Sequence, residues 1–171
     1  MRSWMLTCCV LLVSSGCYSY GLRQPATPPV DAFGPVTSDA RICVLRPHWL
    51  ASAVTAPVHD NGQLVGATRG PSYFCYAAQP GRHEITSKAD SVETATIDVQ
   101  PGQRYYLHQI VDNIVGFVRT RLAWVVEDEA HKMVKECEYR ELVQVPGNEQ
   151  PPSGAPVPAA TVAYAPPPTT H

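Results

Sequence analysis

Turn signals divide residues 40–145 into short segments that have the composition of β-strands. Asn61-Gly62 is a preferred pair for a two-residue hairpin turn, because both central residues of that turn adopt positive φ. Pro80-Gly81 and Pro101-Gly102 each suit a type II turn, in which proline presets φ and glycine accepts a positive φ. This spacing predicts a mainly β fold, which we expect to be an antiparallel Ig-like β-sandwich of about seven strands.

The segments between these turns differ in how they distribute apolar residues. Residues 40–47, ARICVLRP, carry apolar side chains on both faces, as expected of a central strand. Residues 93–99 alternate, so that the odd-numbered apolar residues from Ala95 onward should face the core and the polar residues between them should face solvent. Residues 114–126 are expected to form one bent strand or two short ones.

One helix is expected near the C-terminal end of this region, over residues 126–142. Ala130, Met133, Val134 and Cys137 fall at i, i+3, i+4 and i+7, which places them on one face of a helix. The acidic residues that precede them suit the positive end of the helix dipole. We expect this helix to cover one face or one open end of the sandwich.

The placement of proline defines the domain organisation. Of the 17 prolines in the chain, eight lie in residues 146–171, where too few apolar residues exist to form a core. We therefore expect a Pro-rich disordered tail over residues 146–171 and a flexible tether over residues 17–39. The intervening residues 40–145 are sufficient for a single β-sandwich domain with one core.

The N-terminal residues have the pattern of an export signal. Arg2 precedes an apolar run from Met5 to Val13, which is about half the length needed to cross a membrane. Small residues then lead to Cys17, and the stretch resembles a bacterial lipoprotein signal. That resemblance implies a signal peptide over residues 1–16 and lipidation of Cys17, which becomes the mature N-terminus. The alternative is ordinary secretion with cleavage near Gly16.

Lipidation would fix where the protein resides. Several acyl chains, palmitate among them, on one cysteine bury enough methylene groups for stable attachment to a membrane. We therefore expect a lipid-anchored protein of the bacterial cell envelope. In Gram-negative bacteria, the presence of Tyr18 rather than aspartate after the anchor implies transport to the outer membrane, facing the periplasm.

Residues 40–142 also resemble a known family. The resemblance rests on Tyr73-Phe74, on Pro80-Gly81-Arg82-His83, and on Pro101-Gly102 followed by Tyr105-Tyr106, together with the order of the predicted strands and the closing helix. In these features the segment is similar to the bacterial lipoprotein domain called domain of unknown function 2846. The family implies no established activity, and its usual companion is a lipoprotein signal, which agrees with the interpretation of Cys17.

Four cysteines remain after the predicted processing. Cys17 would carry lipid, which leaves three in an oxidising compartment. Cys43 and Cys75 both lie in the middle of predicted strands, so a disulfide between them is feasible. The alternative is that these two and Cys137 are small buried hydrophobic residues, with Cys137 as the free thiol.

Four tyrosines form a candidate binding surface: Tyr73, Tyr76, Tyr105 and Tyr106. Adjacent residues of a strand face opposite sides, so these side chains cannot all point into the core. A row of exposed tyrosines would suit a glycan or a protein partner. The same residues could instead lie on a second face of the sandwich that the helix covers.

No sequence motif for chemistry stands out. The chain has no GxSxG, no glycine-rich phosphate loop and no HxH or HExxH pair, so we expect no enzyme activity, no cofactor and no metal site. His83 shares strand parity with Ile85, and we expect it to have a structural role near the Pro80-Gly81 turn. With 13 basic and 15 acidic residues and no basic cluster, the chain shows no nucleic-acid-binding character.

These features together predict a membrane-anchored envelope lipoprotein that acts as a noncatalytic binding or structural module. Its expected partners are the membrane, through the N-terminal acyl chains, and other envelope proteins or peptidoglycan. Two alternatives stay open, namely a small-ligand carrier with an apolar cavity in the sandwich and a hydrolase without a recognisable motif. The tail at 146–171 would be either a spacer or a segment that docks on a partner.

Overall fold

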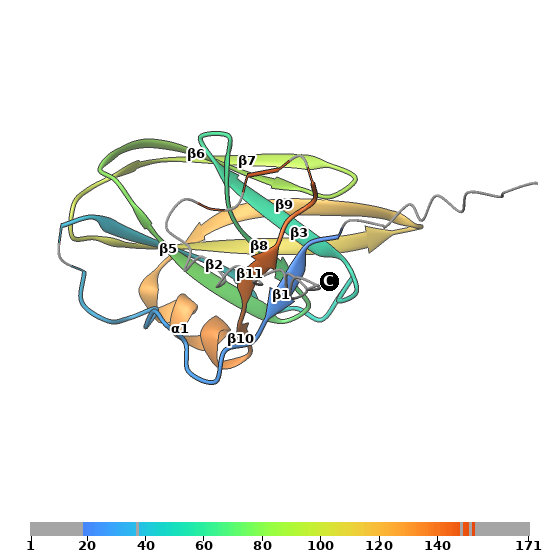
Figure 1. Cartoon of the computed structure of the whole chain (residues 1–171), viewed down its shortest axis with the longest axis horizontal. Coiled ribbons are helices and arrows are strands. Elements are labelled where there is room, and N and C mark those ends of the chain that lie inside the picture. The colour runs from blue at the N-terminus through green and yellow to red at the C-terminus, as the bar shows by residue number, and fades with distance from the viewer. Residues whose placement is uncertain (1–18, 37, 148, 151, 153–171) are drawn as a thin grey trace, which may run out of the picture.

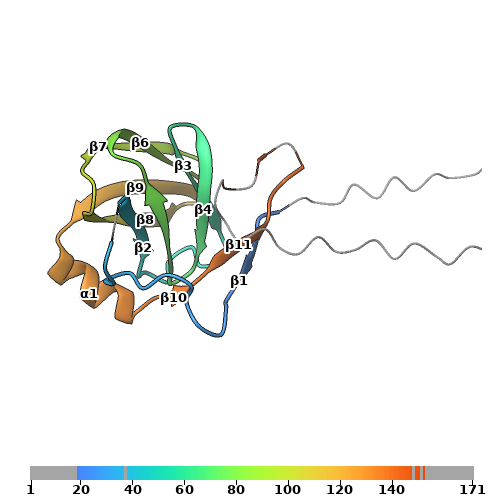
Figure 2. The same ribbon diagram turned by 60° about the vertical axis from the view of Figure 1, so that its left-hand side comes forward.

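The computed structural model describes residues 19–36, 38–147, 149, 150 and 152. Over these residues the protein is mainly β, with eleven strands in three sheets and one short helix near the C-terminal end (Figure 1). The two larger sheets face each other, and a two-stranded ribbon lies beside them (Figure 2). Among the described residues, no helix combines the length and the apolar character needed to span a bilayer.

The larger sheet has five strands and is mixed. In spatial order the strands are β10 (Glu138–Tyr139), β5 (Ser72–Ala78), β2 (Ala40–Arg46), β8 (Arg104–Ile114) and β9 (Phe117–Val125). Strand β2 runs antiparallel to β5 but parallel to β8, and β10 runs parallel to β5. The expected fully antiparallel arrangement is therefore wrong for this sheet.

The second sheet has four strands and is antiparallel throughout. Its spatial order is β4 (Gln63–Arg69), β3 (Thr55–Asp60), β6 (Gly81–Lys88) and β7 (Val92–Val99). Strands β3 and β4 form the predicted hairpin, and Asn61 and Gly62 between them have φ of 49° and 81°. Between β2 and β8 the chain forms all four strands of the second sheet and also β5 of the five-stranded sheet, and β8 then pairs in parallel with β2. An Ig-like topology is not confirmed.

The apolar core fills the space between the two large sheets. Ile42 and Val44 of β2 pack against Val58, Ile85 and Val99 of the opposite sheet, and all five are at most 1% exposed. Burying a side chain of this size stabilises a fold by about 1.5–3 kcal/mol. This cluster therefore holds the two sheets together.

Strand β2 is buried on both faces, as its sequence predicts. Cys43 and Leu45 point away from the core toward α1 (Glu127–Lys135), whose Ala130 is fully buried against them. Three acidic residues occupy the first turn of this helix, at the positive end of its dipole. The predicted helix therefore covers the outer face of the five-stranded sheet (Figure 2).

A chain of buried polar side chains links both sheets at one end of the core. Gln109 of β8 accepts a hydrogen bond from Thr68 of β4 and donates one to Ser87 of β6, at 2.5 and 2.6 Å. The Ser87 hydroxyl lies 2.8 Å from that of Thr120 on β9. All four residues are at most 2% exposed, so these bonds satisfy groups that water cannot reach.

Three predicted boundaries differ from the structure. The helix expected over residues 126–142 is wrong in its second half, because α1 ends at Lys135, Cys137 lies beyond it, and the chain then forms β10 and β11. Residues 114–126 contain one strand, as predicted, but it begins only at Phe117, because Val115 and Gly116, at φ of 51° and 83°, form the turn that joins β8 to β9. The predicted tether contains β1 (Gly21–Arg23), which pairs antiparallel with β11 (Glu141–Gln144). Such short strands carry no periodic pattern from which they could be predicted.

The rest of the described N-terminal segment also packs on the domain. Ala32 is 2% exposed, and the Arg41 guanidinium donates to the main-chain oxygens of Asp31 and Gly34 at 2.7 and 2.9 Å. The predicted signal at 1–16, the predicted anchor Cys17 and residues 153–171 of the predicted tail lie outside the described residues.

Candidate functional site

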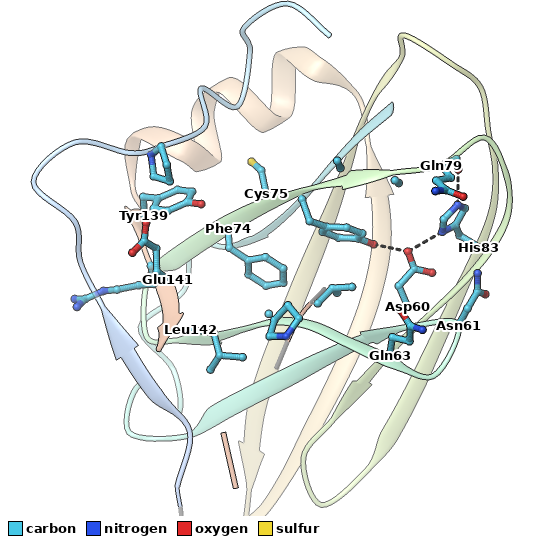
Figure 3. A pocket seen from close by; sticks show the side chains of 18 of the residues that line it. Asp60, Asn61, Gln63, Phe74, Cys75, Gln79, His83, Tyr139, Glu141 and Leu142 are labelled. Atoms are coloured by element: carbon cyan, nitrogen blue, oxygen red, sulfur yellow. Dashed lines mark hydrogen bonds and ion pairs between the residues drawn. The ribbon is translucent and has the colours of Figure 1, made fainter. Parts of the chain in front are cut away.

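A cavity opens where two consecutive strands separate into different sheets. Strands β4 and β5 are joined at Gly70, but β4 is the edge of the four-stranded sheet and β5 belongs to the five-stranded one. Between them lies a cavity of about 760 Å³ (Figure 3). Arg23 of β1 and Glu141 and Leu142 of β11 form its outer wall. Its volume falls within the roughly 300–1,000 Å³ that ligand pockets occupy.

Asp60 joins the two sheets inside this cavity. The Tyr76 hydroxyl of β5 donates to Asp60 Oδ2 at 3.0 Å, and His83 Nδ1 of β6 lies 2.6 Å from the same oxygen (Figure 3). His83 Nε2 donates to the main-chain oxygen of Gln79 at 2.7 Å. The predicted structural role of His83 beside the Pro80-Gly81 turn is confirmed.

The hydrogen bonds of His83 limit the chemistry that it can perform. A main-chain oxygen can only accept, so Nε2 carries a proton, and a second proton lies between Nδ1 and Asp60 Oδ2. Neither ring nitrogen is free to take a proton from a nucleophile, as a histidine general base must do. The arrangement therefore positions the Asp60 carboxyl group rather than activating a reactant.

The second oxygen of Asp60 has no hydrogen-bond partner. Asp60 is 7% exposed, and its Oδ1 is buried without a bond to any described residue. Such groups are rare in native proteins because an unpaired buried acceptor costs free energy.

Tyr76 brings a neutral hydroxyl and an aromatic ring to the site. Burial raises the pKa of Tyr76 above its usual range, and the nearby Asp60 carboxylate raises it further. The phenol consequently stays protonated and keeps donating to Asp60. Beside it, the Phe74 ring packs directly over Gly66 of β4, where an added Cβ would lie 2.4 Å from the ring. Tyr76 and Phe74 thus form an apolar floor next to the polar group.

The described residues contain no group of three or more His, Cys, Asp or Glu side chains that could hold a metal ion. The Asp60–His83 pair is the closest approach to such a group in the cavity, and both His83 nitrogens are already occupied.

Residues 36–118 match the family described as "Protein of unknown function (DUF2846)". This stretch is a DUF2846 domain. The predicted resemblance is thereby confirmed for the family, although the match ends at residue 118 rather than at 142. No curated protein and no solved structure matches the chain. The DUF2846 domain contains Asp60, Tyr76 and His83, whereas α1, β10 and β11 lie beyond the matched residues.

The four tyrosines predicted as a binding surface do not share one face of the DUF2846 domain. Tyr76 and Tyr105 both lie beside Ile42 in register, so they face the inner side of the sheet. Tyr73 and Tyr106, paired with Leu45 and Cys43, face the outer side and are 8% and 3% exposed. Neighbouring residues of a strand face opposite sides of the sheet, so the four tyrosines divide into two pairs on opposite faces. Of the four, only Tyr76 lines the cavity.

The structure places Cys43 and Cys75 in a disulfide. The two residues are directly opposite on β2 and β5, with Cα atoms 4.1 Å apart, and their side chains lie on the helix side of the sheet. Cys137 is a free thiol whose pKa burial raises to about 12. A thiol of this kind is not activated as a nucleophile.

Sequence reasoning missed Asp60 as the centre of the site. Asp60 follows Val58 by two residues on the same strand, so strand parity alone turns it inward. An inward carboxylate at the end of a strand is a signal that could have been noticed. Its partners come from β5 and β6, whose positions relative to β3 no local pattern reveals.

Proposed function

We propose that the chain is a membrane-anchored lipoprotein of the bacterial cell envelope, and that the cavity between β4 and β5 is its ligand site. In this proposal the DUF2846 domain is a noncatalytic binding module. The observation that carries the proposal is the hydrogen-bonded cluster of Asp60, Tyr76 and His83, which lines this cavity at the seam of the two sheets. A ligand with amide, amine or hydroxyl groups would find both polar groups and aromatic rings on the walls of this cavity.

The disulfide supports the proposed location. Disulfides such as Cys43–Cys75 form and persist mainly in secreted and periplasmic proteins, because the cytosol keeps thiols reduced. Export is what the signal-like residues 1–16 imply, and the lipobox-like sequence before Cys17 would then anchor the exported chain. The membrane is therefore the first proposed partner, and another envelope component is the second.

The geometry favours binding over catalysis. The histidine of the cavity has both ring nitrogens engaged, and burial raises the pKa of the one described free thiol, Cys137, to about 12. Nucleophilic catalysis needs a nucleophile next to a free base. A hydrolase without a recognisable motif therefore finds no support in this cavity.

A small-ligand carrier with a cavity inside the sandwich is also less well supported. The space between the sheets is filled at its centre by the apolar cluster around Ile42 and Val44, and at one end by the polar chain through Gln109. A ligand would instead enter at the seam between β4 and β5, where polar groups are present.

Lipidation can be tested on the intact protein. The chain is expressed in a Gram-negative host, extracted from membranes and weighed by mass spectrometry. We expect a mature N-terminus at Cys17 that carries acyl chains, and a Cys17→Ser variant that no longer fractionates with the membrane. An unmodified N-terminus on wild-type protein in the soluble fraction would overturn the anchor.

The ligand site can be tested separately by photocrosslinking in cells. A photoreactive amino acid replaces Gln79, an exposed residue at the rim of the cavity, and in the control it replaces Thr96 on β7, at the opposite edge of the four-stranded sheet. We expect a discrete adduct from position 79 that Asp60→Asn weakens, and no such adduct from position 96. Equal labelling from both positions would contradict a site in the cavity.

A further inference from the structure

Strand β5 has an open edge beside the cavity. On this side it pairs with β10 only at Ser72 and Tyr73. The Arg140 N–H donates to the Tyr73 main-chain oxygen at 2.9 Å, and the chain then leaves β5 so that β11 pairs with β1. Among the described residues, the remaining length of β5 has a neighbouring strand on one side only.

The main-chain groups at this edge belong to Cys75 and Ala77. In an antiparallel pair, alternate residues turn their N–H and C=O groups toward and away from the partner strand. Because the Tyr73 oxygen points to β10, the N–H and C=O groups of Cys75 and Ala77 also point away from β2. Both residues line the cavity, and no described residue pairs with their main chain at this edge.

The open edge of β5 and the cavity beside it point to one class of ligand. Two N–H and two C=O groups along a strand edge are a template for a further strand, and extended peptides bind other proteins in this way. Such a peptide would run alongside β5 within the cavity, which Asp60 and Tyr76 also line.

We propose that an extended peptide occupies the cavity as an added strand on β5, and that this peptide is residues 159–165 of this chain. This proposal rests on the ligand site proposed above. The pairing would satisfy the open main-chain groups of Cys75 and Ala77. A ligand from outside would then compete with the tail for the same edge.

The position of the chain beyond β11 supports this choice of occupant. Glu149 lies 2.5 Å from His59 Nε2 on β3 and also accepts a hydrogen bond from Tyr20. These contacts hold the segment around Glu149 against the four-stranded sheet. Pro152, three residues later, lines the cavity itself. The chain that follows therefore starts at the rim of the site.

The sequence of the tail fits an added strand. Residues 159–165, AATVAYA, contain no proline, so each has the N–H group that strand pairing requires, and Thr161, Val162 and Tyr164 favour strands. The preceding residues 153–158 reach up to about 20 Å when extended, enough to run along the site. The side chains of Thr161 and Tyr164 would lie on opposite faces of the added strand. Whichever face of this strand is turned toward Asp60, one of the two hydroxyl groups therefore lies on that side.

Hydrogen exchange tests this pairing directly. Amide exchange is measured on the detergent-solubilised full chain, on a chain ending at residue 152, and on that shorter chain with a synthetic peptide of residues 153–171. We expect the Cys75 and Ala77 amides to exchange about tenfold more slowly in the full chain than in the shorter one. We also expect the peptide to restore the protection. The amides of Phe74 and Tyr76, which face β2, serve as internal controls and should not change.

Two proline variants of the tail sharpen the test. Val162→Pro removes an N–H from the proposed strand and should abolish the protection, whereas Thr169→Pro, outside the strand, should leave it intact.

Equal exchange of the Cys75 and Ala77 amides in the full and shortened chains would overturn the tail as occupant. Protection that rises with protein concentration would place the tail of a second copy in the cavity and would also overturn it. An adduct from position 79 to another envelope component, with no protection by the tail, would support the ligand site while refuting its occupation by the tail.

Discussion

Cys43 and Cys75 occupy directly opposite positions on β2 and β5, and their disulfide ties the two strands together on the side of the sheet that α1 covers. The bond closes a loop with a sequence separation of 32, which contains the whole hairpin of β3 and β4. Strand β5 also carries Tyr76 and the open edge beside the cavity. The disulfide therefore fixes the strand on which the proposed site depends.

Replacing both bridged cysteines, as Cys43→Ala with Cys75→Ala, should lower the free energy of unfolding by about 3–4 kcal/mol, because the open chain gains conformational entropy when it unfolds. Urea unfolding with and without a reductant measures this difference. Cys137→Ala is the matched control and should keep the sensitivity to reductant. Wild-type protein that unfolds at the same urea concentration under both conditions would contradict the prediction.

The buried polar chain through Gln109 gives a second prediction. Gln109→Leu removes the partner of Thr68 and one of the two partners of Ser87, so the free energy of unfolding should fall by about 2–3 kcal/mol. Adding Thr68→Val should cost less in this background than in the wild type, since the threonine hydroxyl has already lost its partner. Urea unfolding of the four proteins forms the double-mutant cycle, and strict additivity would show that the two side chains are not coupled.

Several features that depend on a single strand or turn were predicted correctly from the sequence. The two apolar faces of β2, the Asn61-Gly62 hairpin and the alternation along β7 each follow from local periodicity or turn chemistry. The helix over Ala130 follows from its apolar face in the same way. These signals act over a few residues and do not need a partner strand to be known.

Features that depend on which strands meet were not predictable in the same way. The parallel pairing of β2 with β8 joins two strands between which the chain forms the whole of the other sheet and also β5. The turn at Val115-Gly116 has a β-branched residue at positive φ, which turn preferences argue against. Asp60 becomes a site only because Tyr76 and His83 approach it from two other strands.

The contact between Gly66 and Phe74 gives a third prediction. Gly66→Ala would bring a Cβ to 2.4 Å from the Phe74 ring, so the ring or strand β4 must move. We expect a loss of about 1–3 kcal/mol in the free energy of unfolding, as for other overpacked cores. In a Phe74→Leu background the same substitution should cost clearly less, because the smaller side chain leaves room. Equal costs in both backgrounds would show that the aromatic ring is not what excludes a side chain at position 66.

Alkaline pH should reveal the burial of Cys137. Burial raises the pKa of this thiol from 9.0 to about 12 in the folded protein. The unfolded chain therefore releases the thiol proton at lower pH than the folded chain does. The resulting stabilisation is fully present below pH 9 and is lost as the pH rises toward 12.

Cys137→Ala removes this titration, so between pH 9 and pH 11 the variant should lose less stability than the wild type. Urea unfolding across this range measures the difference. The buried tyrosines titrate in both proteins and cancel in the comparison, except Tyr73, whose pKa the charge of Cys137 helps to raise. The same burial predicts that an aromatic disulfide reagent at pH 8 reacts with Cys137 far more slowly in the folded protein than in urea. Equal reaction rates in the folded and unfolded protein would mean that the thiol is open to solvent and that the covering of the sheet by α1 is looser than the packing around Ala130 indicates.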